Sequence, residues 1–215
     1  MDSVCQRIFV VTGERVLRAD ARRNRARVLE VAESVFAAQG VEVPVEEVAR
    51  AAGVGVGTVY RHFPTKKDLV EAIVAERMRR LVDRARTLAA HTDSPEALFQ
   101  VVDWIVAEAT VKKHLQATDT APGADKPAAL EALAADLRAV LSQLLAADQA
   151  GGTVRADIEL PDLLMALYGL SAAAEHYGWD TARRHRAITT VFEGLRPRER
   201  SQNSGQPGSS ACIER

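Results

Sequence analysis

Three glycines stand close together in the segment AAGVGVGTVY (51–60), at positions 53, 55 and 57. A glycine inside a helix costs about 1 kcal/mol relative to alanine, so this spacing needs a reason other than helix stability. Gly53 suits the left-handed position that ends a helix, and Gly55 and Gly57 remove side chains where the next helix begins. Because backbone N–H groups at a helix N-terminus bind phosphate, the segment predicts a close approach of main chain to a phosphate-bearing ligand.

Catalytic chemistry has no comparable signal in the 215 residues. We find no Glu-x-x-His metal pair, no nucleophile with its base and no phosphate-binding loop, so we expect a protein that is not an enzyme and uses no metal or cofactor. Cys5 and Cys212 lie near opposite ends, which argues against a disulfide framework and for a reducing cytoplasm. The early apolar run at 8–11 is too short for a signal peptide or a membrane span, so we expect a soluble, cytoplasmic protein with no membrane partner.

Charge divides the chain unevenly, although the formal total is only -1. Residues 1–67 carry 11 Lys and Arg against 8 Asp and Glu, a net charge of +3, whereas residues 68–215 carry 17 against 21, a net charge of -4. An anionic partner is therefore expected at the N-terminal third of the chain.

The periodicity of apolar residues predicts an all-α fold of about nine helices, since no run alternates with period two for long enough to form a sheet. Helices are expected at 22–39, 44–52, 56–63 and 64–90. Later helices are expected to include residues 98–109 and 130–144, and two more are expected to begin at Pro161 and at Asp180. The expected parts are a flexible N-terminal extension at 1–20, a helix-turn-helix domain at 21–68, a ligand-binding and dimerisation domain at 69–197 and a disordered tail at 198–215.

A short helix, a turn built on glycine and a second short helix form the helix-turn-helix plan, whose second helix enters the DNA major groove. The stretches VLEVAESVFAAQG (28–40), VEEVARAAGVGVGTVYRHFPTK (45–66) and KDLVEAIVAE (67–76) closely resemble the TetR/AcrR family of transcriptional regulators. The resemblance implies a homodimer that binds a palindromic operator in double-stranded DNA and acts as a repressor released by a small-molecule effector. The alternative is a helical ligand-binding or interaction protein without DNA binding.

The resemblance also implies which residues meet DNA: Thr58, Tyr60 and His62 face it, and Lys66 holds a phosphate. The full set of expected contacts is Arg22, Arg23, Arg25, Gly55, Val56, Gly57, Thr58, Tyr60, Arg61, His62 and Lys66. Tyr60 and His62 have packing roles as alternatives, Arg61 points either to bases or to solvent, and the arginines of the arm either follow phosphates or form a solvated helix start. Val43-Pro44-Val45 stands where relatives often carry Ser or Thr, so a phosphate contact there is in doubt.

The second half supplies a candidate pocket and a candidate interface. The pocket walls are expected at Met78, Leu81, Phe99, Val102, Val106, Met165 and Tyr168, with ordinary core packing as the alternative. Polar candidates near it are Lys112, Lys113, His114 and His176. The segment 160–179 is apolar around its whole girth, so it is not expected to be a surface helix of a monomer. The dimer interface is expected at Leu163, Leu167, Leu170, Ala174, Ile188, Val191, Phe192 and Leu195, with burial in the chain's own domain as the alternative.

Overall fold

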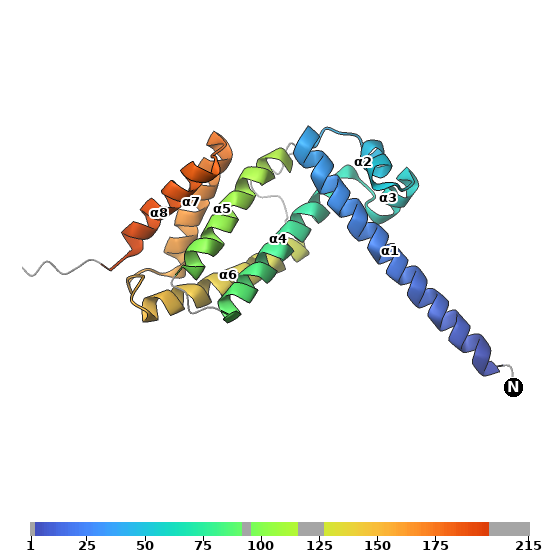
Figure 1. The fold of residues 1–215 in the computed structure, drawn as a ribbon, viewed down its shortest axis with the longest axis horizontal. Coiled ribbons are helices and arrows are strands. Elements are labelled where there is room, and N and C mark those ends of the chain that lie inside the picture. The colour runs from blue at the N-terminus through green and yellow to red at the C-terminus, as the bar shows by residue number, and fades with distance from the viewer. Residues whose placement is uncertain (1–2, 92–95, 116–126, 198–215) are drawn as a thin grey trace, which may run out of the picture.

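The computed structural model describes residues 3–91, 96–115 and 127–197, and all of their regular structure is α-helical (Figure 1). The all-α prediction is confirmed, with eight helices in the described residues rather than about nine. The helices are α1 (Ser3–Gln39), α2 (Val45–Ala52), α3 (Val56–His62), α4 (Lys66–His91), α5 (Ala97–Leu115), α6 (Ala128–Ala150), α7 (Leu160–Tyr177) and α8 (Thr181–Leu195).

The first helix is longer than the sequence predicted. It begins at Ser3 instead of near Arg22, so the segment that we expected to be a flexible extension continues α1. Figure 1 shows the N-terminal half of α1 projecting away from the rest of the molecule. The predicted disordered tail at 198–215 lies outside the described residues.

The head of the molecule consists of the C-terminal half of α1, α2, α3 and the first turns of α4. Its buried core includes Phe36 of α1, Val48 of α2, Val59 of α3 and Leu69 and Ile73 of α4. Each short helix contributes too little apolar surface to be stable alone, so α2 and α3 depend on this shared core. The α3 helix therefore has a fixed orientation on α1 and α2.

The body of the molecule consists of the rest of α4 together with α5, α6, α7 and α8. The α5 helix packs most extensively against α7, and α4 packs against α6. The largest fully buried side chains of this core include Leu98, Leu141, Leu163 and Ile188. Because α4 contributes to both cores, the expected boundary between 68 and 69 falls inside a continuous helix. None of the described helices has the length and hydropathy required to cross a membrane.

Candidate functional site

The turn between α2 and α3 has the geometry that the sequence predicts. Gly53 ends α2 in the left-handed region, at φ 68° and ψ 33°. The N–H of Gly53 donates to the carbonyl oxygen of Arg50 at 3.1 Å, and the N–H of Val54 donates to that of Ala49 at 3.0 Å. A residue with a side chain is strained at this φ, so the role assigned to Gly53 is confirmed.

The other two glycines are not required by the fold. Gly55 precedes α3 in an extended conformation, at φ -69° and ψ 142°, which any residue adopts. A β-carbon at Gly57 would meet no atom within 4 Å, and one at Gly55 would meet only Thr58 Oγ1 at 4.0 Å. Both positions are exposed. The lack of side chains at Gly55 and Gly57 therefore leaves an open surface at the start of α3, and no packing contact among the described residues requires it.

The α3 helix divides into a buried and an exposed side. Val59 is fully buried, and Phe63 directly after the helix is 3% exposed, so these two residues anchor α3 on the head core. Tyr60 is 41% exposed, and Arg61 is also exposed. Tyr60 is thus not a core residue.

Two other residues predicted on the recognition surface, Thr58 and His62, are half-buried. The Nε2 atom of His62 is buried without a hydrogen-bond partner among the described residues, and the ring centroid lies 6.3 Å from that of Phe63. This burial favours the packing alternative for His62 in the conformation described. Tyr60 and Arg61 are thus more exposed on α3 than Thr58 and His62.

Lys66 is the first residue of α4 and is half-buried. Its position is fixed by a capping box that the sequence analysis missed, although Thr-x-x-Asp at 65–68 is its signature. The N–H and Oγ1 of Thr65 donate to Asp68 Oδ2 at 2.8 and 2.7 Å, and the N–H of Asp68 donates back to Thr65 Oγ1 at 3.1 Å. The box fixes the start of α4, where Lys66 lies.

Arginines of α1 bring positive charge close to the turn between α2 and α3 and to the end of α3. The guanidinium carbon of Arg25 lies 5.1 Å from the centre of the Phe63 ring, in a cation–π contact. A guanidinium nitrogen of Arg27 lies 3.7 Å from where a β-carbon of Gly53 would be. Arg22 and Arg23 are exposed farther back on α1, and Arg23 pairs with Asp20. The α1 arginines at 25 and 27 therefore flank the turn and the end of α3.

The start of α2 lacks an anion-binding hydroxyl, in agreement with the departure noted in the sequence. Pro44 precedes the helix and forms no side-chain cap. Glu47 pairs with Arg50 at 2.5 Å, which offsets its charge, and Glu46 is exposed. The cationic side chains beside the turn and the end of α3 thus come from α1 rather than from α2.

Four residues of α7 that we expected at the dimer interface are buried in the core of the chain's own body. Leu163, Leu167, Leu170 and Ala174 are 9% exposed or less and lie in the body core, as does Ile188 of α8. Their assignment to a dimer interface is therefore wrong. Val191, Phe192 and Leu195 of α8 are half-buried against the same core.

The predicted pocket walls do not surround one cavity. Leu81, Val102 and Val106 are buried in the body core, with Met78 and Phe99 packed against it. The Phe99 ring lies edge-on to Phe192 at 5.1 Å. Met165 and Tyr168 are 73% and 76% exposed on the outer side of α7, so their assignment to a pocket wall is wrong. Although α7 is apolar on all sides, only one side can face the body core. The side that carries the leucines faces it.

Of the polar candidates for the pocket, His176 is exposed and its ring lies 4.7 Å from the Tyr177 ring. The side chains at 112–114 lie outside the described residues.

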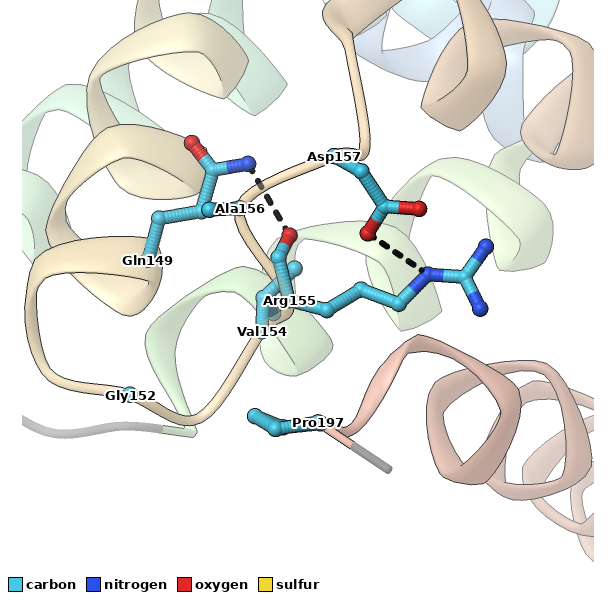
Figure 2. A pocket seen from close by; sticks show the side chains of 7 residues that line it. All are labelled: Gln149, Gly152, Val154, Arg155, Ala156, Asp157 and Pro197. Carbon is cyan, nitrogen blue, oxygen red and sulfur yellow. Dashed lines mark hydrogen bonds and ion pairs between the residues drawn. The ribbon is translucent and has the colours of Figure 1, made fainter. Parts of the chain in front are cut away.

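Two shallow grooves are present on the body instead. Figure 2 shows one of about 470 Å³ at the connection between α6 and α7. Gln149 Nε2 donates to the carbonyl oxygen of Arg155 at 3.2 Å, and Arg155 Nε pairs with Asp157 at 3.1 Å, so the polar groups of this groove fix its own loop. The second groove, of about 490 Å³, is lined by Asp83, Arg84, Thr87, Leu88, His91 and Trp104. It lies on α4 and α5, where the Arg84 guanidinium carbon is 4.1 Å from the centre of the Trp104 ring.

Asp148 is a buried ionisable residue of the body, at 7% exposure near the end of α6. Burial raises the pKa of its carboxyl from 3.8 to about 6. The folded chain therefore binds more protons than the unfolded chain between these two values, so stability falls as pH rises through this window and stays at the lower level above it.

Asp148→Asn is expected to stabilise the fold by about 2 kcal/mol at pH 7, because it removes the cost of ionising a buried carboxyl. The gain should shrink towards zero as the pH falls below 3.8, because the wild-type carboxyl is then protonated in both the folded and the unfolded chain. Urea unfolding of both proteins across this range measures the effect. A constant difference at every pH would show that burial of this carboxyl does not control stability.

Comparison with known proteins covers both parts of the chain. A family model described as bacterial regulatory proteins of the tetR family matches residues 28–73, and one described as the C-terminal domain of SbtR-like transcriptional regulators matches 93–197. An HTH-type transcriptional regulator of Staphylococcus aureus strain USA300 is 41% identical over 59 residues, which are 27% of this chain and 32% of that protein. The chain thus spans about a third of the length of the curated relatives it matches.

Similar solved structures cover much more of the molecule. The TetR transcription regulatory protein from Mycobacterium vanbaalenii is 44% identical, with a TM-score of 0.65, over 84% of this chain and 99% of that one. A TetR transcriptional regulator from Streptomyces coelicolor is 32% identical, with a TM-score of 0.57, over 80% and 98%. With a helix-turn-helix head, a helical body and this similarity along nearly the whole of a known regulator, the chain belongs to the TetR family of transcriptional regulators.

Proposed function

We propose that this regulator is a repressor that binds a palindromic operator as a homodimer and leaves it when a small-molecule effector binds the body. The observation that carries the proposal is the open surface at the start of α3. Gly57 has no neighbour that would exclude a β-carbon, and Arg25 and Lys66 bring cationic side chains from α1 and α4 to the head that holds α3. No catalytic step is part of the proposal, and a regulator of this kind acts in the cytoplasm, where bacterial DNA lies.

In this proposal α3 enters the major groove. Its N-terminal N–H groups at Gly57 and Thr58 approach a phosphate, while Tyr60 and Arg61 reach base edges. Lys66 binds a phosphate as a point charge, and Arg22, Arg23 and Arg25 follow the backbone beside the groove. Phosphate contacts fix the register, and the two exposed side chains of α3 provide the sequence preference.

The exposed side of α7 is the proposed dimer surface. Met165 and Tyr168 are large apolar side chains with more than two thirds of their surface exposed, and Gly169 and Ala172 beside them are small and exposed. Small residues allow two helices to approach closely, and an exposed apolar patch of this kind marks an interaction site. Two copies joined by a two-fold axis would present two heads to half-sites about 34–36 Å apart.

The effector is proposed to act through α4, because this helix carries Lys66 at its start and contributes to the second groove near its end. A shift of α4 changes the position of Lys66 and the tilt of the head. Coupling of about 1–3 kcal/mol between two sites would weaken operator binding roughly 5- to 150-fold.

Lys66→Ala tests the phosphate contact. It is expected to weaken binding to operator and to random duplex DNA alike, because lysine at this position recognises phosphate and not a base. The slope of log K against log salt should shrink by about one for each Lys66 removed. Fluorescence anisotropy over a range of salt concentrations measures both effects.

The matched control is Lys67→Ala, since Lys67 is the next residue of α4 and lies 3.7 Å from Glu71 in an ion pair. It should leave the slope nearly unchanged. Equal slopes for wild type and Lys66→Ala would show that Lys66 does not contact a phosphate of the DNA.

A second candidate function is a helical ligand-binding protein that does not bind DNA. Pro44 at the start of α2, which forms no side-chain cap, and the exposed Glu46 favour it, because neither can bind phosphate. Absence of binding to any duplex at low salt would favour this function over the first.

A further inference from the structure

Four charged side chains form a continuous chain of ion pairs across three helices. Glu108 of α5 accepts from Arg77 Nε of α4 at 2.7 Å, and Arg77 Nη1 donates to Glu33 Oε1 of α1 at 2.7 Å. The other oxygen of Glu33 accepts from Arg80 Nη2 at 2.5 Å. We call Glu33, Arg77, Arg80 and Glu108 the clamp, because they join a helix of the head to a helix of the body.

The clamp is partly shielded from water at its centre. The side chains of Arg77 and Glu33 are 16% and 22% exposed, whereas those of Glu108 and Arg80 at its ends are 40% and 48% exposed. Shielded ion pairs are less screened by salt than surface pairs, and the planar guanidinium of Arg77 fixes the direction of both carboxylates. The centre of the clamp therefore restrains orientation as well as distance.

The clamp lies between the buried apolar residues of the two cores on α4. Along α4, the buried apolar residues of the head end at Ile73 and those of the body begin at Leu81, and Arg77 stands halfway between them. The two hydrophobic cores are separate clusters in the described residues. Directional ion pairs therefore fix the head at a point where few buried side chains would resist a small rotation.

The α5 helix extends the connection to the other side of the body. Asp103, about one and a half turns before Glu108, pairs with Arg184 Nε of α8 at 2.8 Å, and these side chains are only 26% and 13% exposed. Contacts of α5 with α1, α4, α7 and α8 agree with its central place in Figure 1. A single helix is thus tied by ion pairs to the head at one point and to α8 at another.

We propose that the clamp sets the orientation of the head relative to the body. The proposal rests on the proposed function for its effect on DNA, but its structural part does not. Because charge-assisted hydrogen bonds need short distances and good alignment, a small displacement of α4 or α5 is sufficient to weaken them. Arg77 is a positioning residue and makes no DNA contact.

Distance measurement between spin labels tests the structural part directly. Labels are attached to cysteines replacing Glu42 of the head and Gln143 of α6, both exposed, in a chain whose Cys5 and Cys212 are changed to serine. An excess of unlabelled protein ensures that most dimers contain only one labelled subunit, so the measured distances lie within a single chain. The wild-type clamp should give one narrow distance distribution, and Arg77→Gln should broaden or shift it. Arg77→Lys, which retains the charge without the planar fork, should give an intermediate distribution.

Arg79→Gln is the matched control. Arg79 also binds two carboxylates, but its partners Glu76 and Asp83 belong to α4 itself, so losing them breaks no connection between helices. Its distribution should match that of the wild type. Identical distributions for Arg77→Gln and Arg79→Gln would overturn the proposal. If Arg77→Gln does not fold, Glu108→Gln removes only the half-exposed body side of the clamp, and the same comparison decides.

The DNA readout separates the clamp from the binding surface. Arg77→Gln should weaken operator binding about tenfold, within the range typical of coupled sites, while the salt slope stays that of the wild type because no phosphate contact is lost. A smaller slope would place Arg77 on the DNA and overturn its positioning role. A changed distance distribution in a protein that binds no DNA would overturn the proposed function and retain the clamp.

Discussion

Met165→Glu combined with Tyr168→Glu is expected to convert the protein into a folded monomer. Met165 and Tyr168 are 73% and 76% exposed in the single chain, so the carboxylates of the glutamates that replace them would remain in contact with water in a monomer. In the proposed dimer the same carboxylates would be buried without partners. Because the interface has two-fold symmetry, it would contain each substituted residue twice. An unpaired buried charge costs several kcal/mol, roughly enough to raise the dimer dissociation constant by orders of magnitude.

Sedimentation and melting temperature together measure this result. The variant should sediment as a monomer and melt close to the temperature of the wild-type subunit, and its operator affinity should fall to that of one head. Leu167→Glu is the contrasting variant: Leu167 is 5% exposed in the body core, so a carboxylate there should unfold the chain. A double variant that still sediments as a dimer would place the interface elsewhere.

Gly57→Val is expected to abolish most operator binding without harming the fold. A β-carbon at this position meets nothing within 4 Å, and valine has a higher helix propensity than glycine, so stability should be equal or slightly higher. If main chain approaches DNA at this point, the branched side chain intrudes on the phosphate or base edge. We expect operator affinity to fall at least tenfold, about 1.4 kcal/mol.

Anisotropy titration with operator DNA and thermal unfolding provide the two measurements. Gly57→Ala is a graded control, since its single methyl group should reduce affinity less than the two additional methyl groups of valine. Wild-type affinity in a normally folded Gly57→Val protein would contradict close approach, and the glycine would then have no physical explanation.

The ends of several helices could be predicted because they carry local signals. Gly40 and Gly53 adopt positive φ at the ends of α1 and α2, as helix-terminating glycines do. Asp180 caps α8 by accepting from the N–H of Arg183 at 2.7 Å. Such signals depend on residues within a single turn, so the sequence contains them in full.

The sides of α7 could not be assigned in this way. Leu167 and Tyr168 are adjacent and both apolar, so periodicity alone does not decide which of them faces the core. Packing against α5 decides it, and that contact depends on residues distant in sequence. The clamp was missed for the same reason, because Glu33 and Arg77 are 44 positions apart.

Selection from a pool of random-sequence duplexes tests the central claim, that α3 and its flanking cations read DNA, most directly. The wild-type protein should enrich an inverted repeat whose half-site centres are one helical turn apart, about 10 base pairs. The variant with alanine at both Tyr60 and Arg61 should retain salt-dependent binding but lose the enriched sequence, because phosphate contacts remain while base contacts are removed. Absence of any enriched sequence with the folded wild-type protein, or the same repeat with the double variant, would contradict this account.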